Sequence, residues 1–324
     1  MFTILNNIKK HLIIYIFFSI ALGVTFGGLY PEQIASLKVT IIPLTFMLVY
    51  PMMVTLNFKS MTQKINFKLQ GATQIINFII FPLIAYLIGL VFFGEEPFLR
   101  LGLLLIALLP TSGMTISWTV MAKGNVNAAI RMVVIGLLLG AILAPFYISG
   151  LLGAAVDVPV LDIIKQILIV VFVPLGLAII TQFILVKKYG NEVFQTSIKK
   201  KFPPFSTLGV VLIIFVAISL KAQVIIKNPE ILITMLIPLV IMYILFIVVS
   251  VLTARFFFDR NDGIALVNGT LIRSLSLALA ITLSAFPDAK LTALMIAIAY
   301  TLQVQIAAWN VKLTDKIFKK EDVV

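Results

Sequence analysis

The sequence contains no cysteine and a single histidine, His11. Disulfide bonds are therefore excluded, and so are metal sites built from thiolates or from clustered histidines. The HExxH, GxSxG and P-loop patterns are also missing, so the sequence lacks the signatures of a metalloprotease, a serine hydrolase and an ATP-driven pump. On these grounds we expect a protein that is not an enzyme and that needs no metal or cofactor.

Charged residues are scarce as well. They make up 12% of the 324 residues, against 61% hydrophobic residues, and the mean hydropathy is +1.14. A water-soluble domain has about 25% charged residues, so this chain cannot cover itself with polar surface. A bilayer span needs about 20 largely apolar residues. Such stretches predict an all-α membrane protein with ten transmembrane helices, at 11–30, 37–57, 70–94, 99–121, 127–150, 162–186, 205–225, 230–256, 262–286 and 289–311.

The basic residues are distributed unevenly between the loops. With ten spans, both termini and all even-numbered loops face one side, which holds 17 of the 25 Lys and Arg residues. The opposite loops hold six, and Arg131 and Arg273 lie within spans. The positive-inside rule then predicts that both termini lie in the cytoplasm. We expect a multi-pass protein of the plasma membrane. The net charge of +12 is read as a topology signal and not as a nucleic-acid surface.

Two of the predicted spans are interrupted in the middle. The fourth contains "LLPTSGMTISWTVMAKGN" (108–125), where Pro110 removes a backbone donor and Gly113 permits unusual backbone angles. The ninth contains "LVNGTLIRSLSLALAI" (266–281), where we expect the break near Gly269. Broken helices at membrane depth are tolerated only where they are buried in protein or line a wet cavity.

The two breaks occupy equivalent positions in the two halves of the chain. Residues 1–153 and 162–324 each contain five spans, so the second half enters the membrane from the opposite side, which is the geometry of an inverted repeat. Paired broken helices mark the central site of many secondary transporters. We therefore expect the substrate to meet the polar residues around the breaks, which are Thr115, Ser117, Thr119, Asn268, Thr270, Arg273 and Ser274.

Arg273 is the most informative of these residues. A basic side chain in the middle of a span costs roughly 2.5–3.5 kcal/mol on insertion scales and marks a functional site by default. We expect it to supply the countercharge for an anionic substrate. The alternative reading is structural, with the guanidinium paired to backbone carbonyls or extended toward the interface.

The fourth-span segment and "RSLSLALAI" (273–281) resemble the fourth and ninth helices of the bile acid:sodium symporter family and its arsenite-efflux relatives. "NFIIFPL" (77–83) and "YPMMVTLNFKSM" (50–61) are similar to the third and second helices of the same family. The resemblance implies a core domain (spans 3–5 and 8–10), a panel domain (spans 1, 2, 6 and 7), and a crossing of broken helices 4 and 9 in the core. It adds Asn77, at a family glutamine position, to the candidate site.

The departures from that family bear on the transported species. Where sodium-coupled members carry an acidic residue and a glutamine in helix nine, this chain has Gly269 and Arg273, and Ile116 replaces an asparagine in helix four. We therefore expect weak or no sodium coupling, and the coupling ion, proton or sodium, stays open. Arsenite-efflux members carry a cysteine near Ser112 and an acidic residue at Ser276. Without thiolates, arsenite capture is weakened as a hypothesis but not removed.

The leading hypothesis is a secondary transporter for a small or amphipathic organic anion, working by alternating access. An efflux permease for arsenite or another metalloid or anion is the alternative. A membrane sensor that transports nothing is a third hypothesis from a different class, and it predicts neither flux nor stabilisation by a solute.

The charge asymmetry yields a direct test of topology. Cysteines introduced separately at Asn191 and Glu95 are expected to react with an impermeant thiol reagent from opposite sides of the membrane, because the two residues lie in loops of opposite parity. The chain has no native cysteine, so the unmodified protein is the background control. Labelling of both positions from outside the cell would contradict cytoplasmic termini.

Overall fold

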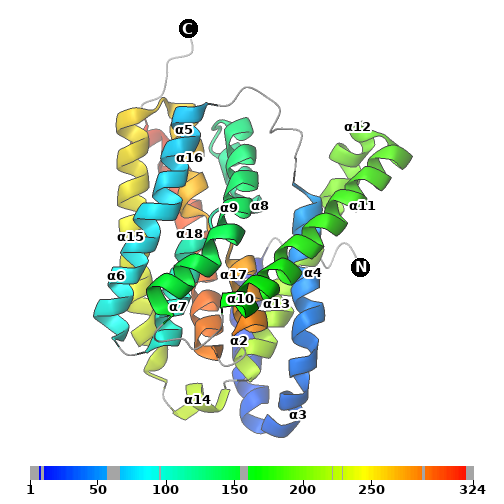
Figure 1. Ribbon diagram of the computed structural model, residues 1–324, viewed down its shortest axis with the longest axis vertical. Helices are drawn as coiled ribbons and strands as arrows, with labels where there is room; N and C mark the ends of the chain where they lie inside the picture. The colour runs from blue at the N-terminus through cyan, green and yellow to red at the C-terminus, as the bar shows by residue number, and fades with distance from the viewer. Residues whose placement is uncertain are drawn as a thin grey trace. The chain divides into compact units, whose positions relative to one another are not determined.

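The computed structural model describes residues 7–8, 11–56, 66–94, 96–153, 160–220, 222–227, 229–286 and 289–318 (Figure 1). These residues are almost entirely helical, and no β-strand occurs among them. The helices are α2 (Leu12–Leu29), α3 (Pro31–Ala35), α4 (Ile41–Val54), α5 (Phe67–Ile75), α6 (Phe81–Phe93), α7 (Pro97–Leu108), α8 (Gly113–Met121), α9 (Val126–Leu152), α10 (Val160–Ile167), α11 (Val173–Tyr189), α12 (Asn191–Val193), α13 (Pro203–Ser219), α14 (Ala222–Lys227), α15 (Ile231–Phe257), α16 (Arg260–Leu271), α17 (Leu275–Ala285) and α18 (Lys290–Ile317).

Short 3₁₀ and π-helical turns connect or continue several of these helices. They are η1 (Ser36–Thr40), η3 (Ile76–Ile80), η4 (Leu168–Phe172), η5 (Phe194–Ile198) and η6 (Lys199–Lys201). The π-helical turns η3 and η4 both stand shortly before a proline at the start of the next helix. Glu95, used in the topology test, lies outside the described residues.

Within the described residues, seven helical stretches are long and apolar enough to cross a membrane. Three shorter apolar helices accompany them, among them α7 and α17. The prediction of an all-α membrane protein is therefore confirmed. The predicted fourth and ninth spans each consist of two short helices, α7 with α8 and α16 with α17. Each of these helices is too short to cross a bilayer by itself, because the backbone breaks in the middle of the predicted span.

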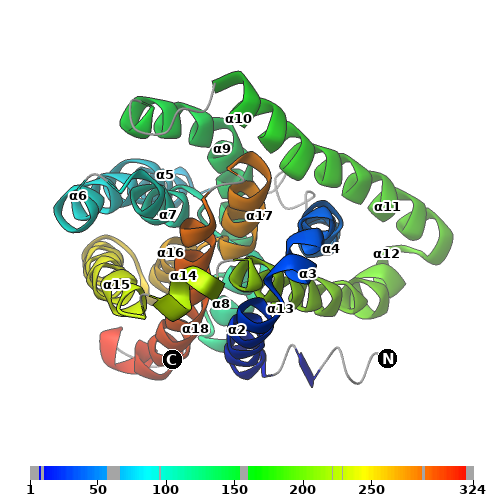
Figure 2. The same cartoon turned by 90° about the horizontal axis from the view of Figure 1, so that it is seen from below.

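The chain divides into two compact units. The first unit contains Met1–Thr55, Asp157–Thr234 and Ser276–Ile298, and the second contains Leu56–Val156, Met235–Leu275 and Ala299–Val324. In the first unit, α13 packs against both α2 and α4, and α11 packs against α4 (Figure 2). In the second unit, α6 packs against α7, and α9 packs against α7, α8 and α16.

Close backbone contact joins α13 to α4 in the first unit. A Cβ atom placed on Gly209 would lie 2.9 Å from the backbone N and Cα of Leu48, so only glycine allows this approach. The Ser206 hydroxyl donates to the Leu48 carbonyl from the same face of α13. From α11, the Gln182 amide donates to the Val54 carbonyl at 2.8 Å.

Three helices of the second unit begin at one shared polar cluster. Asn66, Asn125 and Asp259 cap the starts of α5, α9 and α16 with their side-chain oxygens. The Asp262 carboxylate accepts hydrogen bonds from the Asn66 amide at 2.8 Å and from the Asn125 amide at 2.6 Å. Capping of this kind contributes about 1 kcal/mol per helix. The cluster fixes where the three helices start, and thereby the position of each following residue along its helix axis.

The tight contact at Gly209 can be tested with a matched pair of substitutions. Gly209→Ala is expected to destabilise the protein by about 1–3 kcal/mol, because the added methyl group meets backbone that cannot move aside. Gly176→Ala, on α11 of the same unit, meets no atom within 4 Å and is expected to be neutral or slightly stabilising. Thermal unfolding of both purified variants checks this; equal melting temperatures would contradict the packing.

Candidate functional site

The first break separates α7 from α8 at the predicted position. Helix α7 ends at Leu108 and α8 begins at Gly113. Ser112 caps α8: its hydroxyl accepts from the Met114 N–H at 3.2 Å, and the Thr115 hydroxyl accepts from the Ser112 N–H at 3.2 Å. This reciprocal capping satisfies donors that the break would otherwise leave unpaired.

Thr111 is the strained residue of this break. Its φ of +60° is uncommon for any residue except glycine and unfavourable for a β-branched one. Its buried hydroxyl donates to the Pro110 carbonyl at 2.7 Å. Gly136 of α9 leaves the necessary room, since a Cβ there would lie 2.7 Å from the Thr111 hydroxyl.

The second break lies later in the chain than predicted. Helix α16 continues through Asn268, Gly269 and Thr270 to Leu271, and α17 begins at Leu275. Gly269 is therefore not a helix break, and the expectation of one at Asn268–Thr270 is wrong. The glycine serves close packing instead: a Cβ there would lie 2.5 Å from the Met132 sulfur of α9.

The two breaks meet at one place in the second unit, which we call the junction (residues 109–112 and 272–274). Pro110 and Arg273 form an isolated antiparallel bridge, and the Ser274 N–H donates to the Leu109 carbonyl at 2.8 Å. Gln303 of α18 completes the pairing. Its side-chain amide accepts from the Arg273 N–H at 2.8 Å and donates to the Arg273 carbonyl at 3.1 Å, so it replaces a missing backbone partner.

The Arg273 guanidinium lies inside the junction, with 1% of the residue exposed. Its Nε donates to the Ile106 carbonyl at 3.0 Å, and one Nη2 hydrogen goes to the Ala107 carbonyl. Nη1 donates to the Thr270 carbonyl at 3.0 Å and to the Asn77 side-chain oxygen at 2.5 Å. The guanidinium thus binds carbonyls at the C-terminal ends of α7 and α16, which have no partner within their own helices.

Asn77 links the third predicted span to the same cluster. It lies on the π-helical turn η3, fully buried, and its amide donates to the Gly269 carbonyl at 3.1 Å. Single π-helical turns of this kind occur often at functional sites. Pro82, just beyond the turn, lacks the N–H that would bind the Phe78 carbonyl, and the Tyr147 hydroxyl donates to that carbonyl instead.

Two aromatic rings lie against the Arg273 guanidinium. The guanidinium carbon lies 5.5 Å from the ring centre of Phe81 and 6.0 Å from that of Phe246. These two rings are stacked. Among the described residues, the structure records no ion pair between Arg273 and a carboxylate. The cation is therefore stabilised by carbonyl dipoles and aromatic faces.

The structure brings only part of the predicted site together. Asn77, Pro110, Ser112, Thr270, Arg273 and Ser274 lie at the junction.

The other predicted residues have different surroundings. The Thr119 hydroxyl donates to the Thr115 carbonyl within α8, and Ser117 is exposed. Asn268 is buried and accepts from the Asn310 amide at 3.0 Å. Ser276 lies in the first turn of α17 and belongs to the first unit.

Sequence reasoning left Thr111 and Gln303 out of the site. The signal for Gln303 is available in the sequence, because a buried amide in an apolar span needs a partner, and a broken helix supplies unpaired backbone. The residue type of Thr111 does not predict a positive φ.

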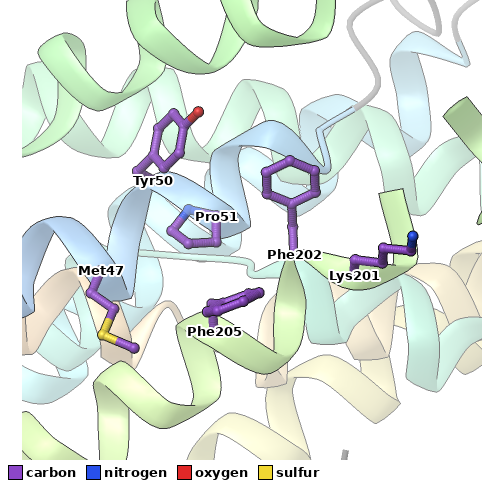
Figure 3. A pocket seen from close by; sticks show the side chains of 6 residues that line it. All are labelled: Met47, Tyr50, Pro51, Lys201, Phe202 and Phe205. Atoms are coloured by element: carbon purple, nitrogen blue, oxygen red, sulfur yellow. The ribbon is translucent and has the colours of Figure 1, made fainter. Parts of the chain in front are cut away.

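An apolar pocket in the first unit is a separate feature (Figure 3). Its walls come from Met47, Tyr50 and Pro51 of α4 and from Lys201, Phe202 and Phe205 at the start of α13. None of the predicted site residues lines it. Its lining offers one charged group and suits an alkyl chain better than a small polar solute.

The chain has helices that are long and apolar enough for a bilayer, and its sequence matches a family of transporters. It is therefore a membrane transporter. The chain belongs to the Sodium Bile acid symporter family, which matches residues 41–228, more than half of its length. That match includes the first break and ends before Arg273.

Curated relatives extend the similarity over most of the chain. An "Arsenical-resistance protein Acr3" from Alkaliphilus metalliredigens is 25% identical over 256 residues, covering 72% of this chain and 71% of the relative. A protein of the same name from Corynebacterium glutamicum is 22% identical over 271 residues, with 78% and 73% covered. An uncharacterized transporter from Synechocystis is 23% identical over 266 residues, with 73% and 70% covered.

The role of Asn77 can be separated from simple burial. Asn77→Leu is expected to destabilise the protein by about 2–3 kcal/mol, because it removes an acceptor from a buried cation and a donor from the Gly269 carbonyl. Thr73→Val, one turn earlier, removes a hydroxyl bonded only to the Leu69 carbonyl of its own helix and is expected to cost less than about 1 kcal/mol. Thermal unfolding of the two variants measures the difference; equal losses would count against the junction.

Proposed function

We propose that this membrane transporter is a secondary transporter that moves a small or amphipathic organic anion across the plasma membrane by alternating access. The proposal includes ten transmembrane helices in two inverted repeats, residues 1–153 and 162–324, with both termini in the cytoplasm. In this proposal helices 3–5 and 8–10 form the core domain, and helices 1, 2, 6 and 7 form the panel domain.

The meeting of two broken helices in the buried part of the second unit carries this proposal. Backbone that leaves a helix inside a membrane protein needs partners, and such breaks are tolerated only where they are buried in protein or line a wet cavity. Discontinuous helices of this kind form substrate and ion sites in secondary transporters. The Pro110–Arg273 bridge joins the two breaks directly.

The charge balance of the junction favours an anion. Arg273 compensates the negative C-terminal ends of α7 and α16. The positive N-terminal end of α8 begins just beyond Ser112 and has no acidic residue in its first turn, so its charge stays uncompensated. Helix N-termini attract anions. In this proposal the substrate meets the hydroxyl-bearing start of α8, and Arg273 keeps the site favourable for an anion by neutralising the negative ends of α7 and α16.

Efflux of arsenite or another metalloid hydroxide is the second candidate. It is favoured by two relatives that are named arsenical-resistance proteins. The absence of cysteine argues against thiolate capture. Hydroxyl groups such as those of Ser112 and Thr115 bind metalloid hydroxides only weakly, so this candidate predicts low affinity.

Flux measurements in proteoliposomes distinguish the candidates. A panel of organic anions and arsenite is tested with and without a sodium gradient, and with and without a pH gradient. We expect flux of an organic anion with little dependence on sodium, because no carboxylate of the described residues accompanies the oxygens at the junction. Flux of arsenite alone would support the second candidate. Flux of no solute, with no stabilisation by any, would support a sensor.

A substitution at Arg273 tests its relation to the substrate. Arg273→Gln is expected to weaken binding of the transported anion by about 30-fold or more, a loss of about 2 kcal/mol or more, because the negative ends of α7 and α16 then stay uncompensated beside the site. Arg273→Lys is expected to recover only part of this, because lysine lacks the planar fork.

Affinity and melting temperature are to be measured on the same purified variants. Arg260→Gln is the matched control, since it removes an arginine whose partner is Asp315 at the protein surface. Unchanged affinity in folded Arg273→Gln, with only a lower melting temperature, would place Arg273 in the scaffold.

A further inference from the structure

The oxygens around the Arg273 guanidinium have the character of a cation site. Three are backbone carbonyls, of Ile106, Ala107 and Thr270, and the fourth is the side-chain oxygen of Asn77. All four are neutral acceptors that converge on one positive group. Uncharged oxygens arranged in this way are the ligands that hard monovalent cations use in proteins.

The same oxygens sit at the negative ends of two helices. Each helix C-terminus carries about half a negative charge, so the ends of α7 and α16 together present about one. One guanidinium neutralises this sum. Without it, two like-charged helix ends would face each other with unpaired carbonyls, in a place where water is scarce.

Further contacts hold the guanidinium in position. Gln303 holds the Arg273 backbone through both of its amide atoms, and the Phe81 and Phe246 rings lie against the guanidinium. These contacts keep the guanidinium at the junction, where solvent does not displace it.

We propose that the junction is a monovalent-cation site that is permanently occupied by the chain's own Arg273 guanidinium, and that becomes a site for a free cation once this side chain is removed. Its functional consequence rests on the proposed transport function: the charge that a dissociable ion would contribute at this place is built into the chain, so no cation enters or leaves here during transport.

Removal of the side chain and addition of free cations test the proposal. Arg273→Ala is expected to lower the melting temperature of the purified protein by about 5 °C or more, since the cation-bound oxygens lose their partner. Millimolar guanidinium or methylguanidinium is expected to restore at least half of the loss. Sodium is expected to restore a smaller part, and choline at the same ionic strength none. The wild type is expected to respond to none of them.

Arg260→Ala is the matched control, because it also removes an arginine but leaves the junction intact. It is expected to show no recovery with any of the cations. Two results would overturn the proposal: folded Arg273→Ala that no cation stabilises, or equal recovery of both variants. Neither depends on a transported solute, so a failure of the proposed transport function would be seen separately in the flux measurement.

A second pair of variants serves where Arg273→Ala does not fold. Arg273→Lys keeps a cation near the oxygens, and Arg273→Met keeps the length of the side chain without the charge. The lysine variant is expected to melt at a clearly higher temperature than the methionine variant. Equal melting temperatures would show that the positive charge is not what the junction requires, and would contradict the proposal.

Discussion

A broken helix inside a membrane protein leaves carbonyl groups without partners, and the hydrogen bonds of Arg273 meet that constraint here. Its guanidinium binds the Ile106 and Ala107 carbonyls at the end of α7 and the Thr270 carbonyl at the end of α16. Because no water is available at membrane depth, each unpaired group would cost several kcal/mol. Asn77 and Gln303 complete the set by binding the Gly269 carbonyl and the Arg273 backbone. The two breaks therefore depend on each other.

This arrangement links the shape of the site to its charge. The negative ends of α7 and α16 are compensated by Arg273, and the positive end of α8 begins directly after the first break. Membership in the Sodium Bile acid symporter family identifies a transporter, while the residues at the junction differ from a sodium site in carrying their own cation. The proposal of an anion as substrate follows from that difference.

The sequence predicted the helical fold and the first break well. Hydropathy located every described helix that is long enough to span a membrane, and Pro110 with Gly113 marked the end of α7 and the start of α8. The second break was misplaced, because Gly269 looked like a helix breaker and serves close packing against Met132. Residue type does not tell these two uses of glycine apart. Pairing of Arg273 with backbone carbonyls was the alternative interpretation of the sequence, but which carbonyls it binds depends on how α7 and α16 pack and could not be predicted.

The most direct test of this account is an experimental structure of the full chain determined twice, once in sodium buffer and once with choline in place of sodium. The account predicts the Arg273 guanidinium between the ends of α7 and α16 in both, within hydrogen-bond distance of the Ile106 and Thr270 carbonyls, and no bound ion at the junction. A guanidinium turned away from these carbonyls, or a sodium ion among them, would contradict it.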